Sequence, residues 1–280
     1  MDEGTSIPGG LFKAETGPFK KIIYGYYRKH GRSLPWRNTD NPYHILISEI
    51  MLQQTQVERV INKYDLFLTQ FPDLMTLAKA PLTEVLRAWQ GLGYNRRALS
   101  LARSAQIILS EYEGTLPANM NELAKLPGIG QATAGSILAF AFNKPSIFIE
   151  TNIRRVFIHH FFAGRDEIRD EEIRPLVEKT LDRSNPREWY YALMDYGSML
   201  KKQIVNPNKR STHYSRQSPF EDSDRKIRGA ILKALLQKPS LTEQEIAVAV
   251  RVNAKRVQNI LIALAREGFI IKSNKVFRIA

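Results

Sequence analysis

Cysteine is absent from all 280 residues of the chain, which excludes disulfide bonds, thiolate-bound zinc and cysteine-ligated iron–sulfur clusters. Long hydrophobic runs are also missing. The longest, residues 136–149, is interrupted by Asn143, Lys144 and Pro145 and falls short of the roughly 20 apolar residues that span a bilayer. Residues 1–5 lack the basic and apolar regions of a secretion signal. We therefore expect a cytoplasmic protein with no membrane contact and a core held by packing alone.

Acidic residues are scarce relative to basic ones, because 28 Asp and Glu stand against 41 Lys and Arg, a formal net charge of +13. Such a charge favours a polyanionic partner through counterion release, and nucleic acid is the first candidate. A basic enzyme without such a partner is the alternative that charge alone leaves open. With 43% hydrophobic residues, the chain can build two or three packed domains.

Most of residues 1–202 follow the helical period. Apolar residues recur at three- and four-residue spacing, as at Val57, Val60 and Tyr64, and turn signals rich in Gly and Pro separate the runs. This pattern predicts an all-α body. Residues 203–219 are polar and basic with almost no aliphatic side chains, which is typical of a linker between domains.

The segment 220–280 is predicted to form a second, smaller domain. The expected elements are amphipathic helices over 224–237, 242–250 and 253–266, and two β-rich runs over 269–271 and 276–279. Three helices followed by a hairpin indicate a winged-helix-like domain.

Basic residues outnumber acidic ones in this segment by 12 to 6. Lys255 and Arg256 open the third expected helix, and Lys272 and Lys275 lie at the tip of the expected hairpin, so these four side chains are candidates for phosphate contacts. The alternative is a small packing or protein-binding domain whose charges are solvated.

A tight glycine turn, Leu126-Pro127-Gly128-Ile129-Gly130, lies within a helix-hairpin-helix predicted at residues 120–142. Its two glycines allow positive φ, so that backbone N–H groups beside the positive end of a helix dipole can hold a phosphate. We expect this turn to grip a nucleic-acid backbone. A turn used only to pack two helices is the alternative.

Two carboxylates in apolar surroundings are candidate catalytic groups. Glu49 lies on an apolar-faced helix that ends in polar amides, and Glu150 follows the apolar run Ile147-Phe148-Ile149. Breaking a glycosidic bond needs an acid that protonates the leaving group and an anion that stabilises the positive sugar. Each carboxylate taken alone is more often a helix cap or a salt-bridge partner.

Several stretches, in order, resemble one protein family. These stretches are 34–37, 42–43, 48–55, 91–94, 126–130 and 152–156. Together they are similar to the catalytic domain of the MutY-type adenine DNA glycosylases of the helix-hairpin-helix (HhH-GPD, endonuclease III-like) superfamily, over roughly residues 15–200. The resemblance implies a two-lobed, all-α glycosylase fold, here with the small C-terminal winged-helix-like domain added.

The resemblance also implies roles for individual residues. Glu49 matches the general acid, Glu150 stands where the family has an aspartate that stabilises the oxocarbenium ion, and Asn152 matches an asparagine that holds the water or the acid. Residues matching the pocket for the flipped adenine are Arg32, Leu34, Trp36, Arg37 and Leu52. Residues expected to contact DNA are Gln53, Gln54, Thr55, Leu92, Tyr94, Gly128, Gly130, Gln131 and Thr133. Gln54 and Tyr94 suit a wedge that enters the base stack.

Departures from the family pattern refine these expectations. Ala132 stands where bifunctional members carry a catalytic lysine, so Schiff-base strand cleavage is not expected. The cysteines of the family's iron–sulfur cluster are missing, and the winged-helix-like segment takes the place of a Nudix-like domain that helps recognise 8-oxoguanine. We expect no required cofactor and no metal-ligand cluster, apart from a monovalent cation at the hairpin turn.

These features predict a monofunctional, monomeric base-excision repair enzyme associated with the nucleoid. It would bind double-stranded DNA carrying a mismatched or damaged base pair and hydrolyse the N-glycosidic bond of a flipped adenine opposite guanine or 8-oxoguanine. Two alternatives stay open. The chain could excise thymine or uracil from G·T and G·U mismatches, or it could be a DNA-binding protein without catalysis.

Overall fold

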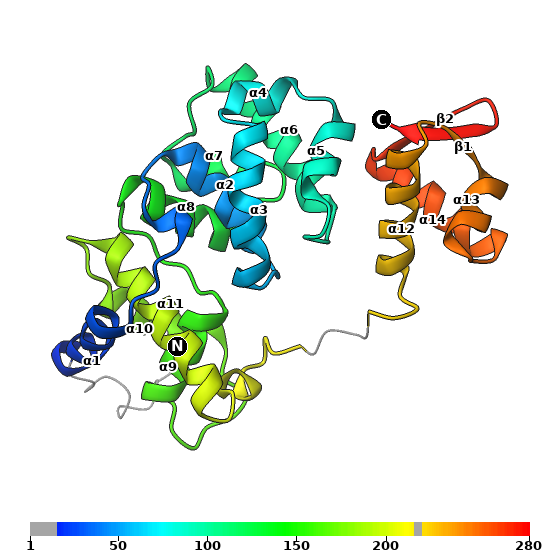
Figure 1. Ribbon diagram of the computed structural model, residues 1–280. Coiled ribbons are helices and arrows are strands. Elements are labelled where there is room, and N and C mark those ends of the chain that lie inside the picture. The colour runs from blue at the N-terminus through cyan, green and yellow to red at the C-terminus, as the bar shows by residue number, and fades with distance from the viewer. Residues whose placement is uncertain (1–15, 216–219) are drawn as a thin grey trace, which may run out of the picture. The chain divides into compact units, whose positions relative to one another are not determined.

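The computed structural model describes residues 16–215 and 220–280, and its helices and strands are labelled in Figure 1. Its contacts divide the chain into two compact units, each made of two chain segments. The first unit contains residues 1–40 and 130–216, and the second contains residues 41–129 and 217–280. In the described part of the chain, almost all regular structure is helical, with one small sheet near the C-terminus, which confirms the predicted fold class. No helix among the described residues is long and apolar enough to cross a membrane.

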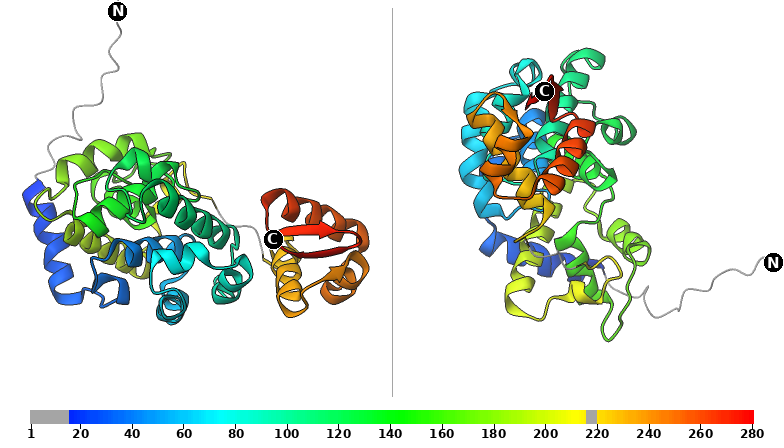
Figure 2. Two further views of the ribbon diagram at one scale, coloured as in Figure 1. Left: turned by 90° about the horizontal axis from the view of Figure 1, so that it is seen from above. Right: turned by 90° about the vertical axis from the view of Figure 1, so that its right-hand side faces the viewer.

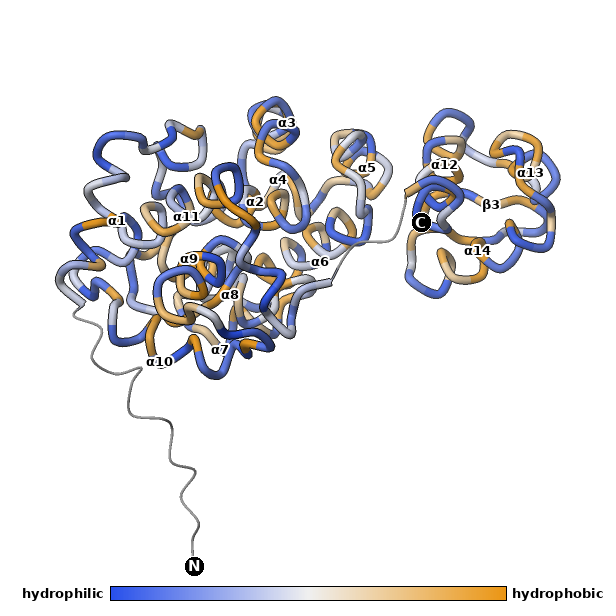
Figure 3. Tube along the Cα trace, turned by 90° about the horizontal axis from the view of Figure 1, so that it is seen from below, coloured by the Kyte–Doolittle hydropathy of each residue, from blue (hydrophilic) through white to orange (hydrophobic). Residues whose placement is uncertain are grey.

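The first unit is built around α11. Its elements are α1 (Thr16–His30), the 3-10 turn η2 (Pro35–Arg37), α8 (Gln131–Phe142), α9 (Thr151–Phe161), α10 (Asp170–Thr180), α11 (Pro186–Gln203) and the 3-10 turn η3 (Pro207–Arg210). Helices α1, α8 and α9 all pack against α11. Two views in other directions show the same helices (Figure 2), and hydrophobic and hydrophilic segments alternate along them (Figure 3).

Aromatic side chains fill the core of this unit. The ring of Phe19 on α1 lies 5.5 Å from that of Phe157 on α9 and 5.9 Å from that of Trp189 on α11. Phe140 on α8 stacks on Tyr191 with ring centroids 4.5 Å apart. Such ring pairs add to the free energy of apolar burial, so they fix how the helices of this unit pack.

The second unit begins with six helices. They are α2 (Pro42–Leu52), α3 (Val57–Gln70), α4 (Leu74–Lys79), α5 (Leu82–Trp89), α6 (Arg96–Glu111) and α7 (Met120–Lys125). Helices α4 and α5 pack against α6, and Phe67, Phe71 and Trp89 form a fully buried aromatic group. Trp89 is a core residue, because it is 0% exposed and its ring N–H donates a hydrogen bond to the Gly93 carbonyl at 3.1 Å.

The C-terminal part of this unit follows the sequence prediction closely. Its elements are α12 (Asp224–Gln237), β1 (Leu241–Thr242), α13 (Glu243–Val250), α14 (Ala254–Glu267), β2 (Ile270–Ser273) and β3 (Val276–Ile279). Thr242 caps α13 through a capping box, Asn253 caps α14, and Gly268 ends α14 with a left-handed φ of 84°.

The sheet of this segment has one strand that the sequence does not reveal. Strands β2 and β3 form the expected antiparallel hairpin, and β1 pairs antiparallel with β3 at Leu241–Phe277 and Thr242–Val276, which gives the order β1-β3-β2. Two residues are too few to show a two-residue period, so β1 could be found only from its pairing.

The predicted linker is ordered over much of its length. Helix α11 ends at Gln203, and η3 then packs against α9 with Pro207 and Asn208 buried. The backbone of Ile168 also bonds to the segment that follows η3, because Thr212 N–H donates to its carbonyl at 3.1 Å. Residues 203–215 therefore belong to the first unit, whereas positions 216–219 of the predicted linker lie outside the described residues.

The close contact between α9 and α11 depends on a glycine. A Cβ at Gly197 would lie 2.5 Å from the Asn152 carbonyl oxygen and 2.8 Å from the Asn152 Cβ. We expect Gly197→Ala to lower the free energy of unfolding by about 3 kcal/mol, since the backbone of α9 would have to move. Urea denaturation checks this.

The matched control is Gly25→Ala on α1, where a Cβ would meet no atom within 4 Å. This change should raise the free energy of unfolding by roughly 0.5–1 kcal/mol, because alanine is the better helix former. Equal effects of the two substitutions would contradict the packing argument.

Candidate functional site

Glu150 is held at the N-terminus of α9. Its Oε1 atom accepts hydrogen bonds from the backbone N–H groups of Asn152 at 2.8 Å and Ile153 at 3.0 Å, and its Oε2 accepts from the Asn152 side-chain amide at 3.2 Å. Glu150 thus caps α9, which is the role that the sequence left open as the alternative to catalysis. The cap also fixes the position of the carboxylate at the positive end of the helix dipole, so both roles are compatible.

A buried arginine orients Asn152. Arg155, 2% exposed, donates to Asn152 Oδ1 and to the Gly197 carbonyl, both at 2.7 Å, and to Asn206 Oδ1 at 3.0 Å. With its oxygen occupied by Arg155, the Asn152 amide directs its NH2 group to Glu150. The predicted pair Glu150 and Asn152 therefore forms one hydrogen-bonded network in the first unit.

Burial raises the pKa of Glu150, while its N–H donors and the positive charge of Arg155 oppose this rise. The carboxyl group is therefore less acidic than an ordinary glutamate, although its hydrogen bonds favour the anion.

A second network joins Arg32 and Arg37 through Asp195 on α11. Asp195 accepts from Arg32 N–H at 2.8 Å and Arg32 Nε at 2.6 Å, and from both terminal nitrogens of Arg37 at 2.8 Å. The Arg37 guanidinium also lies 4.5 Å from the Tyr191 ring. The two arginines lower the pKa of Asp195 against the effect of its burial. Asp195 thus fixes both predicted pocket arginines.

Sequence reasoning missed Asp195. The signal was present, because an aspartate that lies in an otherwise apolar helical stretch needs a buried partner. Which cation it meets could not be read, since its partners are about 160 positions away in the sequence. Helix α11 carries both Asp195 and Gly197, so it connects the arginine pair to the network of Glu150 and Asn152.

The remaining predicted pocket residues are well packed. Leu34 is 6% and Trp36 is 4% exposed in the first unit, whereas Leu52 is half-buried at the end of α2 in the second unit. Leu34 and Trp36 offer little free surface to a base and mainly fix the turn that carries Arg37.

Glu49 lies on α2, between the fully buried Ser48 and Ile50. Asn41 caps this helix by accepting from the N–H groups of Tyr43 and His44, and Glu49 itself is half-buried. The role of Glu49 as a general acid, which needs a carboxyl group within reach of the leaving base, stays a prediction.

Arg97 on α6 holds the C-terminal end of α2 and two loops together. Its Nη1 donates to the carbonyls of Ile50, Met51 and Gln53 at 3.0, 2.7 and 2.6 Å. Its Nη2 donates to the carbonyls of Leu92 and Gly93 at 3.3 and 3.1 Å. The unpaired carbonyls at a helix end carry partial negative charge, so a buried cation is well placed there. Sequence analysis did not identify this residue.

The two residues proposed as wedges have unusual backbones. Gln54 has a φ of 55° and Tyr94 a φ of 47°, which is a region that non-glycine residues seldom adopt. Gln54 is exposed, and the Tyr94 hydroxyl accepts from Arg225 of α12 at 3.0 Å. Both side chains are therefore presented from tight turns. Thr55 lies beside Gln54, half-buried, and Leu92 is buried.

The glycine turn lies between α7 and α8, as predicted. Gly128 has a φ of 79°, and a Cβ there would lie 2.7 Å from Ser100 Cβ, so only glycine fits. Its carbonyl accepts from Gln53 Nε2 at 3.0 Å, and the Pro127 carbonyl accepts from Ser104 at 2.8 Å. Gln53, predicted to contact DNA, thus links this turn to the loop after α2.

The start of α8 is open to solvent. Gly130 is its N-cap, Gln131 and Ala132 are exposed, and Thr133 is half-buried. The first backbone N–H groups of a helix have no partner within the helix, so this end can accept an anion.

The structure groups the predicted residues by unit. In the first unit it brings together Glu150 with Asn152, and Arg32 with Arg37. In the second unit, Arg97 and Gln53 connect the end of α2, the 91–94 loop and the Gly128 turn. No group of three or more His, Cys, Asp or Glu side chains suited to a metal is present among the described residues.

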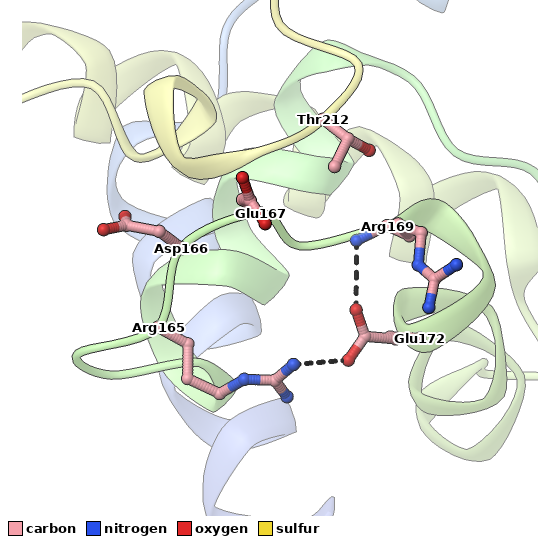
Figure 4. A pocket seen from close by; sticks show the side chains of 6 residues that line it. All are labelled: Arg165, Asp166, Glu167, Arg169, Glu172 and Thr212. Atoms are coloured by element: carbon pink, nitrogen blue, oxygen red, sulfur yellow. Dashed lines mark hydrogen bonds and ion pairs between the residues drawn. The ribbon is translucent and has the colours of Figure 1, made fainter.

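A polar pocket of about 440 Å³ lies elsewhere, beside the loop between α9 and α10. It is lined by Arg165, Asp166, Glu167, Arg169, Glu172 and Thr212 (Figure 4). Glu172 accepts from Arg165 at 2.6 Å and from the Arg169 backbone N–H at 3.1 Å. None of the predicted site residues lines this pocket.

The helical fold and the hairpin turn can be compared with those of known protein families. Residues 47–182 match the family described as "HhH-GPD superfamily base excision DNA repair protein". The match confirms the resemblance inferred from the sequence.

Individual relatives of the chain are DNA glycosylases of two kinds. The chain is 40% identical over 187 residues to the adenine DNA glycosylase of Buchnera aphidicola subsp. Baizongia pistaciae, which covers 65% of this chain and 52% of that protein. It is 29% identical over 186 residues to the thymine/uracil-DNA glycosylase of Methanothermobacter thermautotrophicus, covering 65% of this chain and 84% of that protein. The chain thus spans about half the length of the adenine glycosylase it matches.

A solved structure supports the fold. A thermostable thymine-DNA glycosylase superposes with a TM-score of 0.61 at 24% identity, covering 70% of this chain and 91% of that one.

The raised pKa of Glu150 gives a pH-dependent stability. A carboxyl group whose pKa is higher in the folded than in the unfolded protein stabilises the fold while it is protonated. This contribution is lost as pH rises through the folded-state pKa. Since a glutamine side chain is uncharged at every pH, we expect Glu150→Gln to gain stability relative to the wild type as pH rises above the ordinary glutamate pKa of about 4.3.

Urea denaturation at several pH values measures this difference. The free energy of unfolding of the variant minus that of the wild type should increase with pH. A difference that stays constant or decreases with pH would rule out the raised pKa.

Arg97 should be essential for the second unit. Arg97→Met leaves five buried or partly buried carbonyls without their donor, so we expect a loss of about 3 kcal/mol or more in the free energy of unfolding. The neighbouring Arg96 is the control, because its side chain is 72% exposed and forms a surface ion pair with Glu267. Arg96→Met should cost less than about 1 kcal/mol. Thermal and urea denaturation of both variants distinguish the two roles.

Proposed function

We propose that this protein is a DNA N-glycosylase that excises adenine lying opposite guanine or 8-oxoguanine in double-stranded DNA. One observation carries the proposal. The carboxylate of Glu150 is held by three N–H donors at the head of α9, with Asn152 beside it, in the part of the chain that matches a base-excision repair superfamily. A fixed anion of this kind suits a reaction that builds positive charge on a sugar. The similarity to adenine DNA glycosylases supports adenine as the excised base.

In the proposed reaction, each carboxyl group has the role that the family resemblance implies. Glu49 donates a proton to the adenine, and the bond between the base and the sugar C1′ breaks with its electron pair leaving on the base. Glu150 stabilises the positive oxocarbenium-like sugar. A water molecule, held by Asn152, then adds to C1′ and returns a proton to Glu49, so the enzyme is regenerated and the DNA keeps an abasic site.

The hydrogen bonds of Glu150 would favour a faster cleavage of the glycosidic bond. Because Asn152 and Ile153 already fix the carboxylate, little reorganisation is needed when the sugar becomes positive. Glutamate in place of the family's aspartate keeps the charge and adds one methylene. The cap at α9 is the feature that offsets this added freedom.

Base extrusion would use the two turns with left-handed residues. Removing a base from the stack costs a few kcal/mol, and a side chain that fills the gap offsets part of that cost. Gln54 and Tyr94 are presented by tight loops, and Arg97 holds both loops in place. The Gly128 turn and the open start of α8 would hold the DNA backbone.

The proposal also covers the cofactors, the oligomeric state and the location of the enzyme in the cell. We propose that the enzyme works as a cytoplasmic monomer on nucleoid DNA and needs no cofactor, with a monovalent cation at the Gly128–Gly130 turn. Ala132 offers no amine for a Schiff base, so the enzyme would leave the DNA strand uncut.

Excision assays test the function. Purified protein is incubated with duplexes carrying A opposite 8-oxoguanine, A opposite G, T opposite G or U opposite G, and abasic sites are then cleaved with alkali. Product from the adenine duplexes alone is the expected result. Product from the T or U duplexes would show that the enzyme excises pyrimidines instead of adenine. The similarity to the Methanothermobacter protein supports this alternative. Binding without any product would make the protein a non-catalytic DNA binder.

Glu49→Gln and Glu150→Gln should each reduce the single-turnover rate by about 100-fold or more while DNA binding is retained. Glu58→Gln is the matched control, because Glu58 is an exposed glutamate on α3 outside the proposed site. Full turnover in Glu49→Gln would show that another group is the acid.

A further inference from the structure

One face of α14 is fully exposed. Lys255, Gln258, Asn259, Ile262 and Arg266 recur at three- and four-residue spacing, so they lie on the same side of the helix, and all five are exposed. The opposite side is buried against the small sheet and its neighbouring helices through Val257, Ile260, Leu261 and Leu264. Ile262 is 60% exposed, which is unusual for a large apolar side chain.

This face carries no acidic residue. Glu267 is the only acid on α14, and it accepts from Arg96 at 2.6 Å and Arg228 at 2.5 Å. Lys255 and Arg266 have no ion-pair partner among the described residues. Arg256 is different, because it is held by Asp224 at 2.8 Å and by the Asp222 carbonyl at 2.6 Å. Of the two basic residues predicted at the start of this helix, Lys255 is therefore the one available to a phosphate.

The turn between β2 and β3 adds further positive charge. Ser273 pairs with Val276, so Asn274 and Lys275 form a two-residue turn, in which Asn274 has a φ of 56°. Lys272 and Lys275 are exposed, and neither has an ion-pair partner in the described part of the chain. Lys272 lies 5.4 Å from the Phe277 ring, which supports its aliphatic stem.

The contacts that this segment makes with α5 and α6 use other surfaces. Arg87 donates to the Leu236 carbonyl at the end of α12, and Arg103 donates to the Glu267 carbonyl at the end of α14. A Cβ at Gly268 would overlap the Arg103 guanidinium, so this contact is close. Positions 255–262 of α14 and the β2–β3 turn take no part in these contacts.

We propose that α14 and the β2–β3 turn form a second duplex-DNA-binding surface, separate from the proposed glycosylase site. A helix fits the major groove, and the amides of Gln258 and Asn259 can each pair with N6 and N7 of adenine. Ile262, between them and Arg266, can contact a thymine methyl group. Lys272 and Lys275 are placed to neutralise phosphates. The surface should therefore prefer A·T-rich duplex DNA.

The proposal rests on the proposed function only in taking DNA as the partner. Its readout is the binding of undamaged duplex DNA, which does not depend on excision. Absence of excision would therefore overturn the proposed function without deciding this inference.

Fluorescence anisotropy of the full chain with an undamaged duplex about three helical turns long tests the charge. Lys272→Ala with Lys275→Ala should weaken binding about tenfold and reduce the slope of log affinity against log salt by about two. The matched control is Lys233→Ala with Lys238→Ala, which removes two exposed lysines of the same segment outside this surface. It should leave the slope nearly unchanged.

Gln258→Ala with Asn259→Ala tests the base contacts. This variant should lose about tenfold in affinity for an A·T-rich duplex and little for a G·C-rich duplex of equal length. Circular dichroism checks that the variants fold. The proposal would be overturned if the Lys272 and Lys275 variant had the affinity and salt slope of its control. It would also be overturned if the Gln258 and Asn259 variant lost the same affinity on both duplexes. This face would then be left to a protein partner or to solvent.

Discussion

Two helix ends determine where the candidate catalytic groups lie. The free N–H groups at the head of α9 fix the Glu150 carboxylate, and the free carbonyls at the end of α2 are held by the guanidinium of Arg97. Backbone groups at helix ends need partners when they are buried, and here charged side chains provide them. The same hydrogen bonds that complete the helices therefore position an anion at one end and the loop with Gln54 at the other.

Local pattern predicted a large part of the fold. The limits of α12, α13 and α14 to within one residue, and the hairpin turn at Gly128, follow from the apolar period and from turn signals, which act over a few residues. The resemblance to this superfamily, inferred from ordered motifs, is confirmed by the family match over residues 47–182. Strand β1 was not predicted, because its two residues are defined as a strand only by their pairing with β3.

The candidate site was harder to predict, since its supports come from distant positions. Asp195 meets Arg32 and Arg37 from about 160 residues away, and Arg97 reaches the end of α2 across more than 40. No period or spacing in the sequence indicates which buried charge meets which. The roles given to Glu49, Glu150 and Asn152 stay predictions, and they now have a structural setting in which each can be tested.

The left-handed backbones of Gln54 and Tyr94 have a consequence for thermal stability. Each conformation costs a non-glycine residue roughly 1 kcal/mol that glycine would not lose. Glycine at either position would therefore relieve the backbone but would also remove the side chain. The two loops carry an amide and a phenol ring at the expense of heat resistance.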